Sequence, residues 1–235
     1  IPTKTRCGNA SVGGYLHLNP TSNALMLFFH GNGEIAADYD SLSAIFTACG
    51  VSCWIVDYRG YGRSTGNATY SDMLADAEAL FDDLPRVSEL AGRQFAHHLV
   101  MGRSLGSASA IHLAATRTHQ LAGLILDSPY ADGLALIQRL GGPAIPRGDL
   151  PGFQDNLDEM RHCALPSLII HGTHDRIIPI SDSEALLSAC PCAEKKLLRI
   201  AGAGHNDLLM RGFEQYCDAL RKHIDAATDN PAKGG

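Results

Sequence analysis

The sequence predicts an α/β fold of three layers, in which a mostly parallel central sheet lies between two layers of helices. Short apolar segments rich in Val, Ile, Leu and Phe alternate along the chain with longer segments in which apolar residues recur every three or four positions. Most of the short segments are apolar at consecutive positions, as strands covered by helices on both faces require. No internal repeat interrupts this alternation, so we expect residues 1–235 to form a single domain.

Seven apolar segments are the expected strands of this sheet. They are short and separated by segments of helical periodicity, which favours buried parallel strands over a run of hairpins. In chain order they are Gly14–Leu18, Leu25–Phe29, Ser52–Val56, Leu99–Met101, Leu124–Leu126, Ser167–Ile170 and Lys196–Ile200.

Five further segments are the expected helices. Their bounds are Tyr39–Cys49, Tyr70–Asp83, Ser104–Thr116, Ser183–Ala189 and Phe213–Ala226. Ser71 offers an N-cap for the second of them, because its hydroxyl can accept a hydrogen bond from a backbone N–H of the first turn. The third consists almost entirely of small and apolar residues, so we expect it to be central and mostly buried.

One connection is longer than the usual loop. Residues 128–166 separate two expected strands and carry Leu134, Ile137 and Leu140 at helical spacing. Long insertions of this kind often cover a site, so we expect residues 128–166 to form a small lid or cap. The polar residues 228–235 are expected to be a flexible tail.

Composition excludes several classes of function. A formal net charge of −6, without a block of like charges, makes nucleic acid an unexpected partner. No apolar segment approaches the roughly 18 residues of a membrane helix, so no integral membrane segment is expected. The seven cysteines are odd in number and scattered. We interpret them as free thiols in a reducing compartment, which favours the cytoplasm. The sequence does not determine the oligomeric state or whether a leader preceded Ile1.

The pattern Gly-x-Ser-x-Gly occurs twice, at residues 62–66 and 102–106. A nucleophile elbow requires a buried strand, a sharp turn and then a helix, with glycines on both sides of the serine. Ser104 follows an apolar strand candidate and precedes the apolar helix, whereas Ser64 lies between polar segments. The sequence therefore favours Ser104 as a nucleophile, and the alternative for Ser104 is an N-terminal cap on a buried helix.

A serine hydroxyl needs a base that accepts its proton and a carboxylate that orients the base. Asp175 follows one late strand candidate and His205 follows the next. Because the carboxyl ends of parallel strands meet at one edge of a sheet, both side chains are expected to converge on Ser104. Asp127, at the end of the preceding strand, is the alternative acid. His171 is expected to hydrogen-bond backbone near the acid.

The negative charge that develops on a reacting carbonyl oxygen is stabilised by hydrogen bonds from two backbone N–H groups. Leu105, directly after the nucleophile, is expected to supply one of them. The loop His30-Gly31-Asn32-Gly33 follows a strand candidate and is of the His-Gly type. Asn32 is the favoured second donor and Gly33 the alternative. A plain glycine turn between strand and helix is the structural interpretation of the same loop.

Five motifs stand in the order and spacing of the α/β-hydrolase fold serine hydrolases, which the chain resembles from about Gly14 to about Ile224. They are His30-Gly31-Asn32-Gly33, Asp57-Tyr58-Arg59-Gly60-Tyr61-Gly62-Arg63-Ser64, Gly102-Arg103-Ser104-Leu105-Gly106, His171-Gly172-Thr173-His174-Asp175 and Gly204-His205. The chain is most similar to the α/β-hydrolase domain-containing branch, which includes acyl-protein and acyl-lipid thioesterases and esterases.

The resemblance implies a three-layer α/β-hydrolase fold with Ser104 as nucleophile, Asp175 as acid and His205 as base. It also implies an oxyanion hole formed by the amides of Asn32 and Leu105. Two features depart from the family. There is no long cap domain, and the sequence carries no basic or acylated N-terminal extension, so the membrane attachment of some relatives is not expected.

The expected reaction is hydrolysis of a small-molecule carboxylic ester or thioester through an acyl-enzyme, without a metal or an organic cofactor. Two alternatives stay open: amide or peptide cleavage on the same triad, and a catalytically silent binding protein. Candidate substrate contacts are Gly33, Tyr130, Leu134 and Ile137, although the last three are equally expected to pack the insertion onto the sheet. The acyl length and the leaving group are not determined by the sequence.

Overall fold

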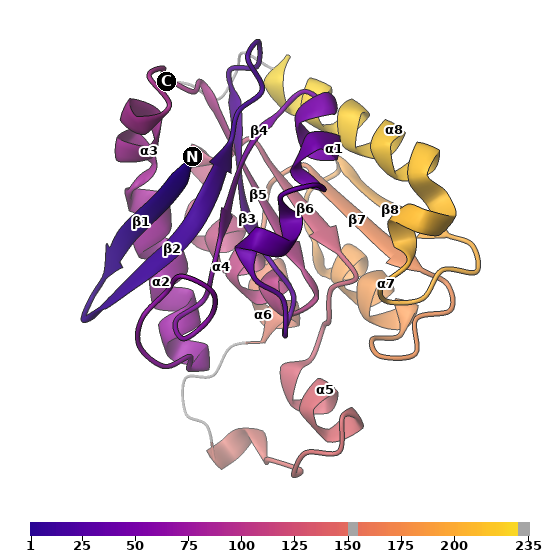
Figure 1. Cartoon of the computed structure of the whole chain (residues 1–235). Coiled ribbons are helices and arrows are strands. Elements are labelled where there is room, and N and C mark those ends of the chain that lie inside the picture. Colours follow the sequence, from indigo (N-terminus) through magenta and orange to yellow (C-terminus); the bar gives the residue numbers. More distant parts are fainter. Residues whose placement is uncertain (150–154, 230–235) are drawn as a thin grey trace.

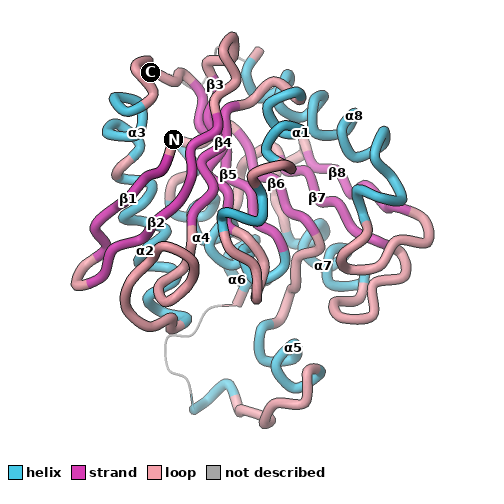
Figure 2. The backbone as a smooth tube through the Cα atoms, viewed as in Figure 1, coloured by secondary structure: helices cyan, strands magenta, loops and turns pink. Residues whose placement is uncertain are grey.

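The computed structural model describes residues 1–149 and 155–229. Its centre is an eight-stranded sheet in the order β1-β2-β4-β3-β5-β6-β7-β8, seen as the magenta layer in Figure 2. Strands β4, β3, β5, β6, β7 and β8 run parallel, while β1 and β2 form an antiparallel pair at one edge. The strands are β1 (Pro2–Cys7), β2 (Ala10–His17), β3 (Ala24–Phe29), β4 (Ser52–Val56), β5 (His97–Arg103), β6 (Gly123–Asp127), β7 (Ser167–Gly172) and β8 (Lys195–Ile200).

The mostly parallel sheet and all seven predicted strands are confirmed, and β1 is an additional strand. Its residues alternate between exposed and buried, with Thr3, Thr5 and Cys7 facing inward. An edge strand covered on one face has no continuous apolar run, so the feature that indicated the other strands is missing from it. At the opposite edge, β8 exposes Lys195, Lys196 and Arg199.

Helices cover both faces of the sheet, as the three-layer prediction requires (Figure 1). On one face, α1 (Ser43–Ala48) and α8 (Leu208–Thr228) bury Phe46, Tyr216 and Leu220 against the strands. The other face is covered by a second group of helices, which shares a core with β3, β5 and β6. This group consists of α2 (Tyr70–Asp82), α3 (Leu84–Leu90), α4 (Ser107–Thr116), α6 (Asn156–Met160) and α7 (Ile180–Ala189).

Several helix boundaries differ from the prediction. The N-cap of α2 is Thr69 rather than Ser71: Thr69 is extended, and its Oγ1 accepts a hydrogen bond from the N–H of Asp72. Of the predicted helix over 39–49, only α1 is helical; a 3₁₀ turn, Ala36–Tyr39, ends where the predicted helix begins. Helix α8 begins earlier than predicted, and the non-helical backbone of Gly212 explains why its periodicity is clear only from Phe213 onward.

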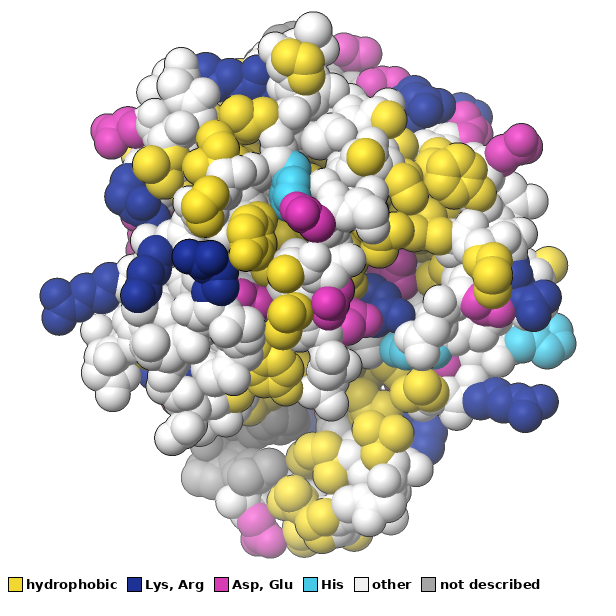
Figure 3. Space-filling model, in the orientation of Figure 1, with side chains coloured by type: hydrophobic (Ala, Val, Ile, Leu, Met, Phe, Trp, Pro, Cys, Tyr) yellow, Lys and Arg dark blue, Asp and Glu magenta, His cyan; other side chains and the backbone are white. Residues whose placement is uncertain are grey.

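The insertion over 128–166 has two unlike parts. Helix α5 (Gly133–Arg139) projects beyond the sheet layers (Figure 1). Hydrophobic side chains lie on the surface here (Figure 3): Ile137 on the helix is 42% exposed, and Leu140, directly after it, is 64% exposed. Helix α6 instead buries Met160 in the core. Among the described residues of the insertion, those around α5 therefore lie outside the sheet layers, whereas α6 belongs to the core. Residues 150–154, and 230–235 of the expected tail, lie outside the described residues.

The longest helix, α8, buries one side against the sheet and exposes the other. Within residues 1–149 and 155–229, no helix combines the length and the apolar character needed to traverse a bilayer.

Candidate active site

Ser104 stands at a sharp turn between β5 and α4. Its φ of 50° lies in the left-handed region, which costs a residue with a Cβ atom about 1–2 kcal/mol. Glycines flank the turn because there is no room for side chains. A Cβ atom on Gly102 would lie 2.3 Å from the carbonyl oxygen of Gly106, and one on Gly106 would lie 2.1 Å from that of Phe29. The turn therefore has the geometry of a nucleophile elbow.

Gly106→Ala is expected to lower the free energy of unfolding by about 3 kcal/mol or more, because the new methyl group overlaps backbone that cannot move cheaply. Chemical denaturation measures the change. The matched control is Gly92→Ala: Gly92 has a φ of 67° but no heavy atom within 4 Å of the added Cβ, so only backbone strain of about 1 kcal/mol is expected. Equal losses in the two variants would contradict the steric argument.

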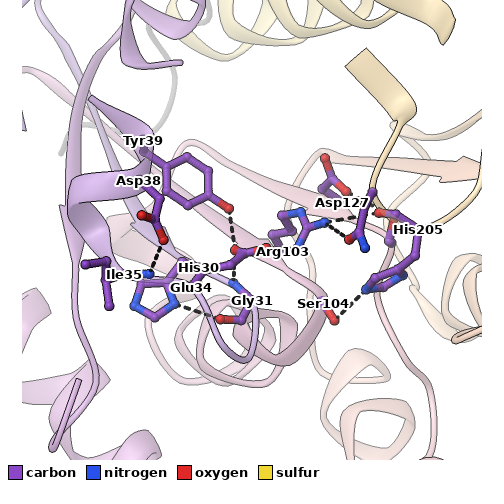
Figure 4. A network of polar contacts seen from close by, with 12 residues as sticks. His30, Gly31, Glu34, Ile35, Asp38, Tyr39, Arg103, Ser104, Asp127 and His205 are labelled. Carbon is purple, nitrogen blue, oxygen red and sulfur yellow. Dashed lines mark hydrogen bonds and ion pairs between the residues drawn. The ribbon is translucent and has the colours of Figure 1, made fainter. Parts of the chain in front are cut away.

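The structure brings Ser104, His205 and Asp175 together at the carboxyl edge of the sheet. His205 Nε2 lies 2.9 Å from Ser104 Oγ, and His205 Nδ1 lies 2.7 Å from Asp175 Oδ2. Figure 4 shows the imidazole turned toward the hydroxyl. The three side chains follow β5, β8 and β7. The contacts form a continuous path for a proton from the hydroxyl to an imidazole that a carboxylate orients.

Asp175 is held as an anion. Its Oδ1 accepts hydrogen bonds from the N–H groups of Ile177 and Ile178, at 2.8 and 2.9 Å. Burial raises the pKa of Asp175, but hydrogen bonds from His171, His205 and the backbone outweigh burial and hold that pKa well below its usual range. A carboxylate that stays ionised can stabilise a positive charge on the imidazole.

His171 and Asp127 are two further titratable residues near the site, and both make hydrogen bonds to structural partners. His171 Nε2 lies 2.9 Å from the carbonyl oxygen of Ile178, and its Nδ1 lies 2.6 Å from Ser183 Oγ, so the expected backbone partner is present. Asp127, the alternative acid, accepts a hydrogen bond from the hydroxyl of Tyr216 at 2.8 Å. Within the described ranges, no group of three His, Cys, Asp or Glu side chains could hold a metal ion.

The second Gly-x-Ser-x-Gly segment has a structural environment. Ser64 Oγ accepts the N–H of Gly13 at 2.9 Å, and Thr65 Oγ1 accepts the N–H of Ser11 at the same distance. These bonds attach the loop to β2. Ser64 therefore anchors this loop to β2.

The loop after β3 carries Asn32 and Gly33, the two candidates for the second N–H donor to an oxyanion. Asn32 is exposed, and its Oδ1 accepts a hydrogen bond from the hydroxyl of Tyr61 at 2.8 Å. Among the hydrogen bonds of the described residues, none has the N–H of Asn32 as its donor. Gly33 has a φ of 79°, which is favourable for glycine. Leu105 follows Ser104 in the first turn after β5.

Two hollows lie beside these residues. The larger, the His205 hollow, has a volume of about 440 Å³, and its lining includes Asn32, Glu34, Asp38, Arg103, Asp127 and His205. It lies on the face that carries α1 and α8, where hydrophobic side chains are interspersed with acidic ones (Figure 3). The smaller, the tyrosine hollow, has a volume of about 180 Å³, and its lining includes Tyr58, Tyr61, Ala68, Tyr70, Met73 and Leu105.

Three of the expected substrate contacts line neither hollow. Tyr130 is 3% exposed and lies in the core, because the chain turns inward directly after β6. Leu134 and Ile137 are on α5, the projecting helix. Gly33 does lie in the loop next to Asn32. The interpretation of Tyr130 as a residue at the mouth of the site is therefore replaced by a core role.

Arg103 is a residue of this site that the sequence did not indicate. Its guanidinium forms an ion pair with Glu34 and donates to the carbonyl oxygen of His205 at 3.1 Å and to Asn206 Oδ1 at 2.7 Å. Glu34 in turn accepts the N–H of Gly31 at 2.7 Å. One side chain thus joins the turn at Ser104, the loop after β3 and the loop after β8 (Figure 4).

Comparison with known proteins gives a consistent result. The family model described as serine aminopeptidase, S33, matches residues 20–150. Human α/β hydrolase domain-containing protein 17B is 31% identical over 226 residues, which are 94% of this chain and 73% of the relative. The 17C protein of Xenopus laevis is 30% identical over 220 residues, 92% of this chain and 66% of the relative.

Solved structures are similar over nearly the whole chain. An esterase of Pyrococcus furiosus superposes with a TM-score of 0.78 at 16% identity, covering 96% of this chain and 91% of that one. Est1E from Butyrivibrio proteoclasticus with bound ferulic acid gives 0.76 at 19% identity, covering 97% and 100%. These likenesses show the fold.

Proposed function

Because the chain belongs to the α/β-hydrolase family, in the group of the α/β hydrolase domain-containing 17 proteins, we propose that it cleaves a carboxylic ester or thioester through an acyl-enzyme on Ser104. The observation that carries this proposal is the pair of contacts at His205, 2.9 Å to Ser104 Oγ and 2.7 Å to Asp175 Oδ2. These distances are within the range for proton transfer between a nucleophile, a base and an orienting acid.

In the proposed reaction, Ser104 Oγ attacks the carbonyl carbon and His205 Nε2 takes the hydroxyl proton. His205 then gives this proton to the leaving oxygen or sulfur, which departs as an alcohol or thiol. A water molecule, deprotonated by His205, releases the acid and regenerates Ser104. The N–H groups of Asn32 and Leu105 donate to the carbonyl oxygen while it carries negative charge. All proton transfers occur among Ser104, His205, the substrate and water, so the reaction requires no cofactor.

Amide or peptide cleavage is the second candidate, because the matching family model is described as a serine aminopeptidase. The same triad attacks amides, and the difference lies in the protonation of a poorer leaving group.

We propose the cytoplasm as the compartment. All seven cysteines are free thiols and five of them are buried, which suits a reducing environment.

A fluorophosphonate probe and three matched substrates test the function. The probe is expected to form a covalent adduct with Ser104, located by mass spectrometry of the labelled peptide. An ester, a thioester and an anilide of the same acyl group are then compared by kcat/KM, and the anilide is expected to be at least 100-fold slower. A faster anilide would favour the amidase, and an unlabelled Ser104 with no turnover of any of the three would contradict a hydrolase.

Arg103→Met is expected to lower kcat by about 10- to 100-fold with little change in KM, since displacement of a catalytic loop by about 1 Å has effects of this size. The reason is that Arg103 positions the His205 loop relative to Glu34. Steady-state kinetics with the ester measures the change. Added guanidinium ion should restore part of the kcat of Arg103→Ala.

The matched control is Arg93, an arginine remote from the site. It donates to the carbonyl oxygens of Asn19 at 2.7 Å and Pro20 at 3.0 Å. Arg93→Met should lower the free energy of unfolding without changing kcat, and guanidinium should not affect it. If Arg103→Met lowered only stability, a positioning role would be wrong.

A further inference from the structure

The direction of proton transfer determines which half of a substrate lies in which hollow. His205 Nε2 must reach the leaving atom after it has taken the proton of Ser104, so the leaving group departs on the side of His205. The His205 hollow includes His205 and Asn206 in its lining, whereas the lining of the tyrosine hollow contains no residue of the loop after β8. The acyl group must then extend to the other side of the serine.

The tyrosine hollow borders one proposed oxyanion donor, Leu105, and is linked by a hydrogen bond to the other, Asn32, which itself lines the His205 hollow. Leu105 lines it directly, and Tyr61, another lining residue, donates its hydroxyl hydrogen bond to Asn32. A carbonyl oxygen held between the N–H groups of Asn32 and Leu105 would therefore have its acyl substituent at the entrance of this hollow.

The volume of the tyrosine hollow limits the size of the acyl group that it can hold. It measures about 180 Å³, slightly more than the cavity of about 150 Å³ that binds benzene in an apolar protein core. A group of about six carbon atoms, either a chain or one aromatic ring, fills such a space.

The residues that line the tyrosine hollow determine which kind of acyl group it can bind. The rings of Tyr58 and Tyr61 face the hollow while their hydroxyls are used elsewhere, that of Tyr58 as a donor to the carbonyl oxygen of His30 at 2.6 Å. Among the described residues of the lining, Arg59 is the one cation, and it is paired with the two acidic residues, Asp72 at 2.8 Å and Asp76 at 2.7 Å. Because one cation is paired with two anions, these three side chains together carry a net charge of −1. An acyl group that ends in a carboxylate would meet repulsion and no free cation in this lining.

The His205 hollow differs in size and charge. It measures about 440 Å³ and is lined by Glu34, Asp38 and Asp127 against the single guanidinium of Arg103, which Glu34 already pairs. It accommodates a larger leaving group that is neutral or cationic.

We propose that the tyrosine hollow is the acyl subsite, specific for a neutral aliphatic or aromatic acyl group of about six carbons, and that the His205 hollow receives the leaving group. This assignment rests on the proposed function. It names the acyl class that the reaction would accept.

A series of p-nitrophenyl esters tests the size and charge limits. Hexanoate and benzoate are expected to give the highest kcat/KM, with acetate and dodecanoate lower. The monoester of adipate, which has the length of hexanoate and a terminal carboxylate, is expected to be at least tenfold slower than hexanoate. A dodecanoate ester hydrolysed faster than hexanoate, or an adipate monoester equal to it, would overturn the assignment.

Two tryptophan variants separate the hollows. Ala68 is exposed at the rim of the tyrosine hollow, so Ala68→Trp should fold and should lower the ratio of hexanoate to acetate turnover at least tenfold. Leu209 lines the His205 hollow. Leu209→Trp should leave that ratio unchanged and instead lower turnover of acetate esters with bulky alcohols relative to methyl acetate. If Leu209→Trp changed the acyl ratio and Ala68→Trp did not, the two subsites would be reversed and the proposal wrong.

The failure of this assignment is distinguishable from failure of the proposed function. If Ser104 forms the fluorophosphonate adduct and acetate is hydrolysed, but Ala68→Trp leaves the acyl ratio unchanged, the acyl subsite alone is refuted. If neither labelling nor acetate hydrolysis occurs, the hydrolase proposal itself fails, and the subsite with it.

Discussion

Replacement of Ser104 by Ala should lower the kcat/KM of every ester substrate by roughly 10⁴- to 10⁶-fold, because the proposed nucleophile is removed. The activity that remains is attributed to binding and to polarisation of the carbonyl by the proposed oxyanion donors, the N–H groups of Asn32 and Leu105. The free energy of unfolding should change by only about 1 kcal/mol, since a single hydrogen bond at the surface of the site is lost. Kinetics and chemical denaturation measure these two quantities, and loss of probe labelling checks that the nucleophile has been removed.

Ser64→Ala is the matched control, since it changes the serine of the second Gly-x-Ser-x-Gly segment. Ser64 Oγ accepts the N–H of Gly13, so the variant should lose about 1 kcal/mol of stability and keep its turnover and its labelling. The opposite pattern, with Ser104→Ala active and Ser64→Ala inactive, would assign the nucleophile to the wrong motif.

The second large effect is expected for Asp175→Asn, which should lower kcat by about 10⁴-fold near neutral pH. An amide at this position can present its N–H₂ group to His205, which favours the wrong tautomer of the imidazole. The folded structure also depends on the carboxylate, because its pKa is held below the usual range. The stability from this carboxylate is fully present above about pH 4 and is lost as the pH falls toward the folded-state pKa. Asp175→Asn should lack that acid-side loss in unfolding experiments.

Asp127→Asn tests the alternative acid. The amide oxygen can still accept the hydrogen bond that the Tyr216 hydroxyl donates to Asp127, so kcat should fall by no more than a few-fold. A loss as large as that of Asp175→Asn would transfer the orienting role to Asp127.

The sequence predicted the parts of the fold whose signal is local. Continuous apolar runs identified the parallel strands, but they could not identify β1, in which inward threonines alternate with exposed residues. The cap of α2 was placed two residues late because Thr69 and Ser71 are both good caps. Only the extended backbone of Thr69 decides between them.

In the site, too, local signals were predictive, whereas contacts between distant segments were not. Ser104, Asp175 and His205 were indicated because each follows a strand candidate, and strand order alone brings such positions to one edge. The pairing of Arg103 with Glu34 joins residues 69 positions apart and depends on the exact path of two loops. The two expectations for Tyr130 could not be separated for a related reason: the sequence shows that an insertion begins there but not that its first residues turn into the core, where Tyr130 packs.

The outer strand β8 carries Lys195, Lys196 and Arg199 along the open border of the sheet. Exposed borders of sheets are templates for pairing between molecules. Arg199 is paired with Glu184 at 2.9 Å. If two copies met border to border, the charges of Lys195 and Lys196 would be brought near their counterparts, and like charges across a strand pair are destabilising. The basic border should therefore protect concentrated solutions of the protein from growth of the sheet into aggregates, and acetylation of its lysines should weaken that protection.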